Sequence, residues 1–146
     1  MKLLPIKEKL EDNEAFINNP LCAETLPMTI DFYKRVGFVE PWIGYYAEVN
    51  ETIIGCAGFK GKPTNGTVEI AYGTFEQYQQ QGKGAEMCKQ LVLLSLSTDP
   101  SIRITARTIP EENFSTSILK KNNFILLGVA NDPEDGDVWE WLYQNK

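Results

Sequence analysis

The spacing of the apolar residues changes once within residues 67–97, and this change marks the most informative stretch of the chain. In Thr67–Thr74, apolar residues alternate with polar or small ones, as in a strand with one buried face. In residues 85–96, apolar residues recur at helical intervals. The polar residues 76–84, with two glycines, lie between them. This order predicts a strand that passes through a glycine-bearing turn into the N-terminus of a helix.

The same patterns predict the other elements. The further expected strands are residues 2–6, 42–49, 52–59, 102–107, 124–129 and 138–143. The further expected helices are residues 7–18, 23–36 and 111–122. Asn19-Pro20 should break the first of these helices, and Pro27 should lie near the start of the second, which Gly37 should end. Pro110 should open the third, and Asn50-Glu51 should form a two-residue hairpin loop.

The order of these elements predicts the topology of the sheet. Residues 42–49, 52–59 and 67–74 should form an antiparallel meander. A helix separates strand 67–74 from strand 102–107, so these two strands should be parallel, with a right-handed crossover. The expected fold class is therefore α+β, with a mixed, mostly antiparallel sheet, helices on both faces, and one domain over residues 1–146.

Composition narrows the possible functions. The chain has 146 residues, 42% of them hydrophobic, and a formal charge of −6, which argues against a nucleic-acid partner. It contains no histidine, which excludes Ser-His-Asp and Cys-His triads and removes the commonest metal ligand. Its three widely spaced cysteines, Cys22, Cys56 and Cys88, favour neither a disulfide framework nor a zinc site. With no signal peptide and no membrane-spanning apolar run, we expect a cytoplasmic protein without a metal or a membrane partner.

The turn before residues 85–96 has the chemistry of an anion site. The first amides of a helix lack internal partners, and the helix dipole favours negative charge there. Gly82 and Gly84 let backbone approach a phosphate closely, and Lys83 adds positive charge. From these residues alone, an ordinary strand-to-helix turn stays equally open. A nucleotide-phosphate module is disfavoured, because no Ser or Thr follows Lys83 and no Mg²⁺-holding residue is evident.

Two motifs at this spacing resemble the GNAT superfamily of acetyl-CoA-dependent N-acetyltransferases. The closest resemblance is to the branch that includes the ribosomal-protein alanine N-acetyltransferases, over roughly residues 42–143. The turn motif Gln/Arg-x-x-Gly-x-Gly/Ala is matched by Gln79, Gly82 and Gly84. The second motif, Pro-(acidic)-Asn-x-x-Ser…Leu-x-Lys-x-Gly-Phe, is matched by Pro110, Ser115, Leu119, Lys121 and Phe124. In this motif Asn113 stands one place later than the usual Asn, and Asn123 replaces the usual Gly.

The resemblance implies a GNAT-like acyl-CoA N-acyltransferase fold that uses acetyl-CoA as co-substrate. The pyrophosphate would lie on the turn, the strand end would pair with the pantetheine arm, and Asn113 and Ser115 would contact the pantetheine or the thiol. The implied cofactor-binding residues are Thr74, Phe75, Gln79, Gln80, Gln81, Gly82, Lys83, Gly84, Ala85, Asn113 and Ser115. Asn113 could equally be a polar residue at the start of a helix, whereas for Ser115 the contact with the ligand is preferred over a polar residue of the first turn.

The implied reaction is direct attack of a primary amine on the thioester. Glu69 would be the base, directly or through water, with Glu76 and Glu112 as alternatives; an exposed strand carboxylate is the other interpretation of Glu69. Leu119 stands where many members have a Tyr acid. Ser115 would then hydrogen-bond the leaving sulfur, and Tyr72 or Tyr78 could take the place of the missing acid.

Several points stay open at this stage. The acceptor could be a small-molecule amine or a protein or peptide amine, and the protein could be a monomer or a homodimer. A different class of function is also open, namely a non-catalytic acyl-CoA sensor or interaction domain on the same fold.

Overall fold

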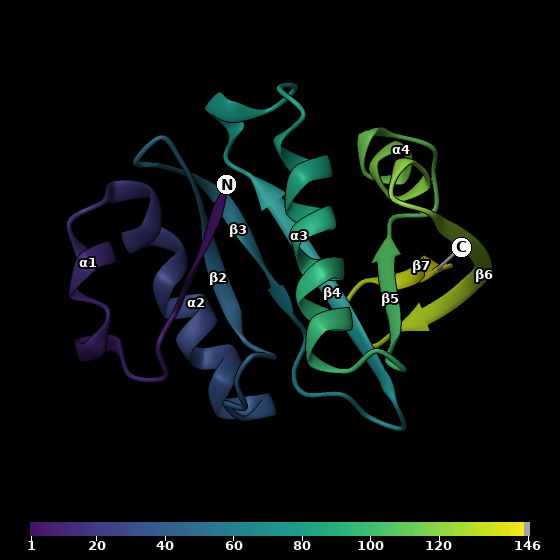
Figure 1. Cartoon of the computed structure of the whole chain (residues 1–146), viewed down its shortest axis with the longest axis horizontal. Coiled ribbons are helices and arrows are strands. Elements are labelled where there is room, and N and C mark those ends of the chain that lie inside the picture. The colour runs from purple at the N-terminus through teal and green to yellow at the C-terminus, as the bar shows by residue number, and fades with distance from the viewer. Residues whose placement is uncertain (145–146) are drawn as a thin grey trace.

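Seven strands form a single sheet in the order β1-β2-β3-β4-β5-β7-β6 in the computed structural model, which describes residues 1–144 (Figure 1). The strands are β1 (Lys2–Pro5), β2 (Gly44–Val49), β3 (Thr52–Phe59), β4 (Thr67–Thr74), β5 (Arg103–Thr108), β6 (Phe124–Asp132) and β7 (Gly136–Tyr143). Only β4 and β5 are parallel neighbours; the other pairs are antiparallel. The predicted mixed, mostly antiparallel sheet is confirmed, and β1 extends the predicted meander to four strands.

Helices cover both faces of this sheet. They are α1 (Glu14–Ile17), α2 (Pro20–Val36), α3 (Lys83–Thr98) and α4 (Phe114–Lys121). On one face α2 packs over β2, where the Tyr46 hydroxyl donates to the carbonyl of Cys22 at 3.0 Å. On the other face α3 crosses β4 and α4 lies beside it (Figure 1). Among residues 1–144, none of the helices combines the length and the apolar composition that crossing a bilayer would need.

The N-terminal helix predicted over residues 7–18 is wrong for its first half. Only a 3₁₀ turn, Leu10–Asp12, and the short α1 form there. The reason is Asn13, which is 2% exposed and whose side chain bonds the N–H of Lys7 and the carbonyls of Lys7 and Lys9. These bonds satisfy the backbone in a loop, so a regular helix cannot form over the same residues.

The start of α2 also differs from the prediction. Asn19 accepts from the N–H of Leu21 at 3.0 Å, and Pro20 is the first helical residue. This pair was expected only to end the preceding helix, but it begins α2, three residues before the predicted start at residue 23. As a result Pro27 lies in the helix interior. Gly37 ends the helix at φ 92°, as predicted.

The hairpin prediction is confirmed, because Asn50 and Glu51 form a two-residue loop with φ of 49° and 66°. The last predicted helix starts three residues too early. Pro110 lies outside α4, and Asn113 caps it.

Candidate functional site

β4 and β5 separate at the middle of the sheet. Their parallel ladder joins Thr67–Ile70 to residues 103–106 and then ends, although both strands continue. A cavity of about 330 Å³ lies at the point of separation. Its lining residues are Ile70, Ala71, Tyr72, Ala106, Arg107, Thr108, Ile109, Asn113, Ser115 and Leu119. We call this opening between β4 and β5 the seam.

The polar turn after β4 leads directly into α3. Gln80 and Gly82 both have left-handed backbone, with φ of 63° and 75°. The first amide of α3 with a helical partner is that of Glu86, which donates to the carbonyl of Gly82 at 3.3 Å. The amides of residues 83–85 therefore have no acceptor in the described backbone. Successive free amides at a helix N-terminus form a binding place for a phosphate.

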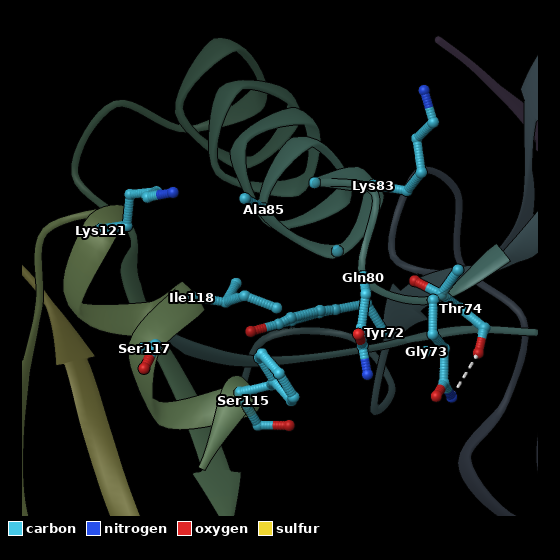
Figure 2. A pocket seen from close by; sticks show the side chains of 14 residues that line it. Tyr72, Gly73, Thr74, Gln80, Lys83, Ala85, Ser115, Ser117, Ile118 and Lys121 are labelled. Atoms are coloured by element: carbon cyan, nitrogen blue, oxygen red, sulfur yellow. Dashed lines mark hydrogen bonds between the residues drawn. The ribbon is translucent and has the colours of Figure 1, made fainter. Parts of the chain in front are cut away.

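A cavity of about 500 Å³ lies against this turn, between α3 and α4 (Figure 2). It is lined by Tyr72, Gly73, Thr74, Gln79, Gln80, Gly82, Lys83, Gly84, Ala85, Phe114, Ser115, Ser117, Ile118 and Lys121. Its volume falls within the range of small-molecule sites. We call it the turn cavity.

The turn cavity and the seam share two lining residues, Tyr72 and Ser115, so they adjoin. Figure 2 shows the Tyr72 ring reaching from β4 toward α4, with its hydroxyl ending near Ile118. Burial, and secondarily the nearby Cys88 thiol, raises the pKa of Tyr72, so the phenol keeps its proton at neutral pH. An elongated ligand can therefore extend from the α3 N-terminus to the gap between β4 and β5, past two hydroxyl groups.

Glu69 lies on the face of β4 opposite α3, in a charged cluster. Lys60 Nζ is 2.9 Å from its Oε2, and Arg107 Nε is 3.9 Å from its Oε1. Arg107 also contacts Asp132 at 3.0 Å and Glu140 at 3.3 Å. Oε2 of Glu69 is buried, yet Lys60 is not aligned to donate a hydrogen bond to it. Glu69 lines neither cavity, but its neighbour Arg107 lines the seam.

Most of the sequence-predicted site residues meet at the turn cavity. Those that line it are Thr74, Gln79, Gln80, Gly82, Lys83, Gly84, Ala85 and Ser115. The Lys83 side chain points away from Tyr72 and Gln80, so its backbone, more than its charge, faces the cavity (Figure 2).

Other predicted residues lie elsewhere or are already engaged. Gln81 and Phe75 line neither cavity, and the Phe75 N–H donates to the carbonyl of Ile54 at 2.9 Å. Asn113 lines the seam, but its Oδ1 accepts from the Thr116 N–H at 3.1 Å as the cap of α4.

The carboxylates considered as alternatives to Glu69 are exposed. Glu112 is paired with Lys120 at 2.9 Å, and Glu76 lies in the 3₁₀ turn Glu76–Tyr78. Tyr78 lines a separate cavity between the start of α2 and the β2–β3 loop, whereas Tyr72 lies at the candidate site.

The sequence analysis did not identify the residues of α4 that face the turn cavity. Phe114, Ile118 and Lys121 all line it. Ile118 and Lys121 lie four and seven residues after Phe114, on the same side of the helix, so the period of the helix could have identified them. Arg107 gave a weaker signal, since only the register of the β4–β5 ladder brings it beside Glu69. Within residues 1–144, no group of three or more acidic or cysteine side chains is arranged to hold a metal ion.

Comparison with known proteins gives a relative in sequence. No family model matches the chain. The uncharacterized N-acetyltransferase YjdG of Bacillus subtilis (strain 168) is 32% identical over 98 residues, which are 66% of this chain and 55% of YjdG. The chain therefore spans about half the length of this curated relative.

Solved structures share the fold. RimL, the ribosomal L7/L12 alpha-N-protein acetyltransferase in complex with coenzyme A, is 19% identical with a TM-score of 0.63, over 84% of this chain and 70% of its own. A chimera of the spermidine N-acetyltransferase SpeG from Vibrio cholerae with hSSAT is 12% identical with a TM-score of 0.70, over 98% of this chain and 95% of its own. At these identities the likeness establishes the fold alone, and it extends to structures named for a ribosomal protein and for a polyamine.

Proposed function

The chain has the fold of the GNAT acetyltransferases and resembles that superfamily in sequence, and from this premise we propose that it is an acetyl-CoA-dependent N-acetyltransferase. The observation that carries the proposal is the pair of adjoining cavities that lead from the α3 N-terminus to the seam. A ligand that fits it needs an anionic end for the free amides and a narrow arm that passes between β4 and β5. Acetyl-CoA has its pyrophosphate and its pantetheine thioester in that order.

The amides of Lys83, Gly84 and Ala85 would bind the pyrophosphate. Beyond Ile70, the edge of β4 that faces β5 has lost its ladder partner, so its backbone groups could pair with the pantetheine arm. Ser115 and Tyr72 lie where the two cavities adjoin, and the thioester would pass between them.

In the proposed reaction, the nitrogen of a primary amine attacks the carbonyl carbon of the thioester and the carbon–sulfur bond breaks. Glu69 takes the proton from the nitrogen, directly or through water. Lys60 Nζ lies 2.9 Å from Oε2 of Glu69, so an amine that reached this oxygen directly would displace Lys60. The Ser115 and Tyr72 hydroxyls would donate to the departing sulfur, because Leu119, which stands in place of the usual acid, has no donor.

The acceptor of the proposed reaction is a primary amine of a small molecule or of a protein or peptide. RimL and the SpeG chimera differ in the acceptor that their names give, and each shares the fold with this chain. A non-catalytic acyl-CoA sensor is the second candidate function. Its support is Leu119, which is 1% exposed at the seam and has no proton to donate, although it stands where many members of the superfamily have a Tyr acid.

The proposal is tested in two stages. Thermal unfolding is first followed with acetyl-CoA and, as control, ATP; only acetyl-CoA should raise the melting temperature. Thiol release is then measured across polyamines, amino acids and peptide N-termini. A raised melting temperature without transfer to any amine supports the sensor instead, and no rise at saturating acetyl-CoA overturns both functions.

The role of Glu69 is tested by Glu69→Gln, which keeps the shape and removes the charge. We expect the acetyl-CoA-induced rise in melting temperature to persist and turnover to fall about 100-fold or more. Glu112→Gln, at an exposed carboxylate, is the matched control and should acetylate normally. Normal turnover in Glu69→Gln would exclude it as the base while leaving the acetyltransferase function standing.

A further inference from the structure

The two edges of the sheet are built differently. β1 forms one edge and has four residues, which include Lys2 and Pro5. Short length, lysine and proline are devices that keep an edge strand from pairing with another chain. β6 forms the other edge, is nine residues long, and lies at the outer margin of the molecule (Figure 1). Its one protective device is a β-bulge between Leu126 and Gly128.

β6 also exposes large apolar side chains. The exposed fractions are 41% for Ile125, 44% for Leu126, 49% for Leu127 and 66% for Val129. Residues 124–130 contain no charged residue at all. A long, neutral, apolar strand with a free backbone edge associates readily with another strand.

We propose that the free edge of β6 pairs antiparallel with β6 of a second copy of this chain. The charges at the two ends of the strand favour this occupant. Lys121 lies three residues before β6 begins at Phe124, and Asp135 lies three residues after β6 ends at Asp132. Antiparallel pairing brings the basic end of each copy beside the acidic end of the other, and parallel pairing would bring like charges together.

A two-fold axis through the β6–β6 contact also limits the assembly to two chains. Each copy presents the same surface to the other, so apolar residues meet apolar residues and the contact ends with two chains. The formal charge of −6 opposes association of two copies in general. The segment 124–130 carries no charged side chain and so adds nothing to that repulsion. This proposal is independent of acetyl transfer.

The first test is the solution mass, measured by sedimentation equilibrium over a range of concentrations. The unmodified protein should have about twice the chain mass of 16.5 kDa. Val129→Lys should raise the dissociation constant at least tenfold. Leu93→Lys is the matched control, because Leu93 is 52% exposed on α3, and it should leave the dimer intact. Circular dichroism shows that each variant is folded.

The second test separates antiparallel self-pairing from any other association. Lys121→Glu should weaken the dimer, and so should Asp135→Lys. Combining both substitutions in one chain restores opposite charges across the two-fold axis and should recover much of the affinity. A monomeric unmodified protein, assemblies larger than two, a dimer insensitive to Val129→Lys, or the absence of charge-swap recovery would each overturn the proposal.

Discussion

At the scale of single residues, the missing side chain of Gly84 helps to shape the turn cavity. A Cβ on this residue would lie 2.7 Å from the Cδ1 of Ile118, so the missing side chain leaves the room that Ile118 of α4 occupies against α3. The obstructing atom is the end of a flexible side chain, which can rotate away. Because Ile118 lines the cavity, any rotation changes the space left for a ligand.

We therefore predict that Gly84→Ala lowers ligand affinity more than stability. The added methyl displaces Ile118 into the cavity, and the acetyl-CoA dissociation constant should rise about tenfold, equivalent to about 1.4 kcal/mol. The melting temperature of the free protein should change little, since alanine suits a helix. Calorimetric titration measures the affinity. Gly84→Ala combined with Ile118→Val should recover it, and a double variant as weak as the single one would contradict the mechanism.

At the scale of elements, Arg107 connects the strands around the seam. It belongs to β5 and contacts carboxylates on three other strands: Glu69 on β4, Asp132 on β6 and Glu140 on β7. The Arg107 side chain is 26% exposed, so solvent screens these contacts only in part. Because the ladder between β4 and β5 is short, the contact of Arg107 with Glu69 adds a side-chain link between the two halves of the sheet.

Arg107→Met should destabilise the protein by about 2 kcal/mol, since it leaves three carboxylates close together without their shared cation. Urea unfolding measures the change. Arg103→Met is the control, because Arg103 is on the same strand but exposed, and it should cost less than about 0.5 kcal/mol. Equal effects of the two substitutions would show that the cluster does not hold the sheet together.

A second element, α4, depends on its cap. Asn113 and Thr116 bond each other's backbone N–H groups at 3.1 and 2.9 Å. Asn113→Ala should cost about 1 kcal/mol of stability, whereas Asn113→Ser, which can still cap, should cost less. Denaturant unfolding checks both variants. If Asn113→Ser keeps stability but loses acetyl-CoA affinity, then Asn113 also contacts the ligand, as the sequence motif implied.

At the scale of the whole molecule, buried tyrosines set an alkaline limit on stability. Burial is the largest cause that raises the pKa values of Tyr33 and Tyr45 from 10.0 to about 12. Their hydroxyls donate to the carbonyls of Ile6 at 2.7 Å and Pro41 at 2.6 Å. An ionised phenol loses its donated bond and places a charge in the core, so the folded state favours the protonated form.

The stabilisation from these phenols is complete below pH 10 and is lost as pH rises from 10 toward 12. Each tyrosine should then contribute a fall of about 1.4 kcal/mol per pH unit. Urea unfolding at successive pH values measures the slope, and ultraviolet absorbance follows phenol ionisation. Tyr33→Phe should reduce the slope by one tyrosine's share. Phenols that all titrate near pH 10 in the folded protein would contradict this prediction.

The sequence was sufficient for the features that are encoded locally. Alternation in Thr67–Thr74, the paired left-handed residues Asn50 and Glu51, and the Gly82 turn were all predictable, because neighbouring residues determine them. The loop around Asn13 was not, since its backbone bonds replace a helix that local propensity favours. The Arg107 cluster was not either, because it depends on sheet order and register.

The seam has a consequence for how the molecule responds to mechanical and exchange probes. It divides the sheet into β1–β4 and β5–β7, joined by a ladder of four residue pairs. A bound pantetheine arm that pairs with β4 would connect the two parts of the sheet. Those amide hydrogens of residues 71–74 that point toward β5 should then exchange with deuterium much more slowly when acetyl-CoA is bound. Pulling the two halves apart should also need more force, so the co-substrate would serve as a removable part of the scaffold.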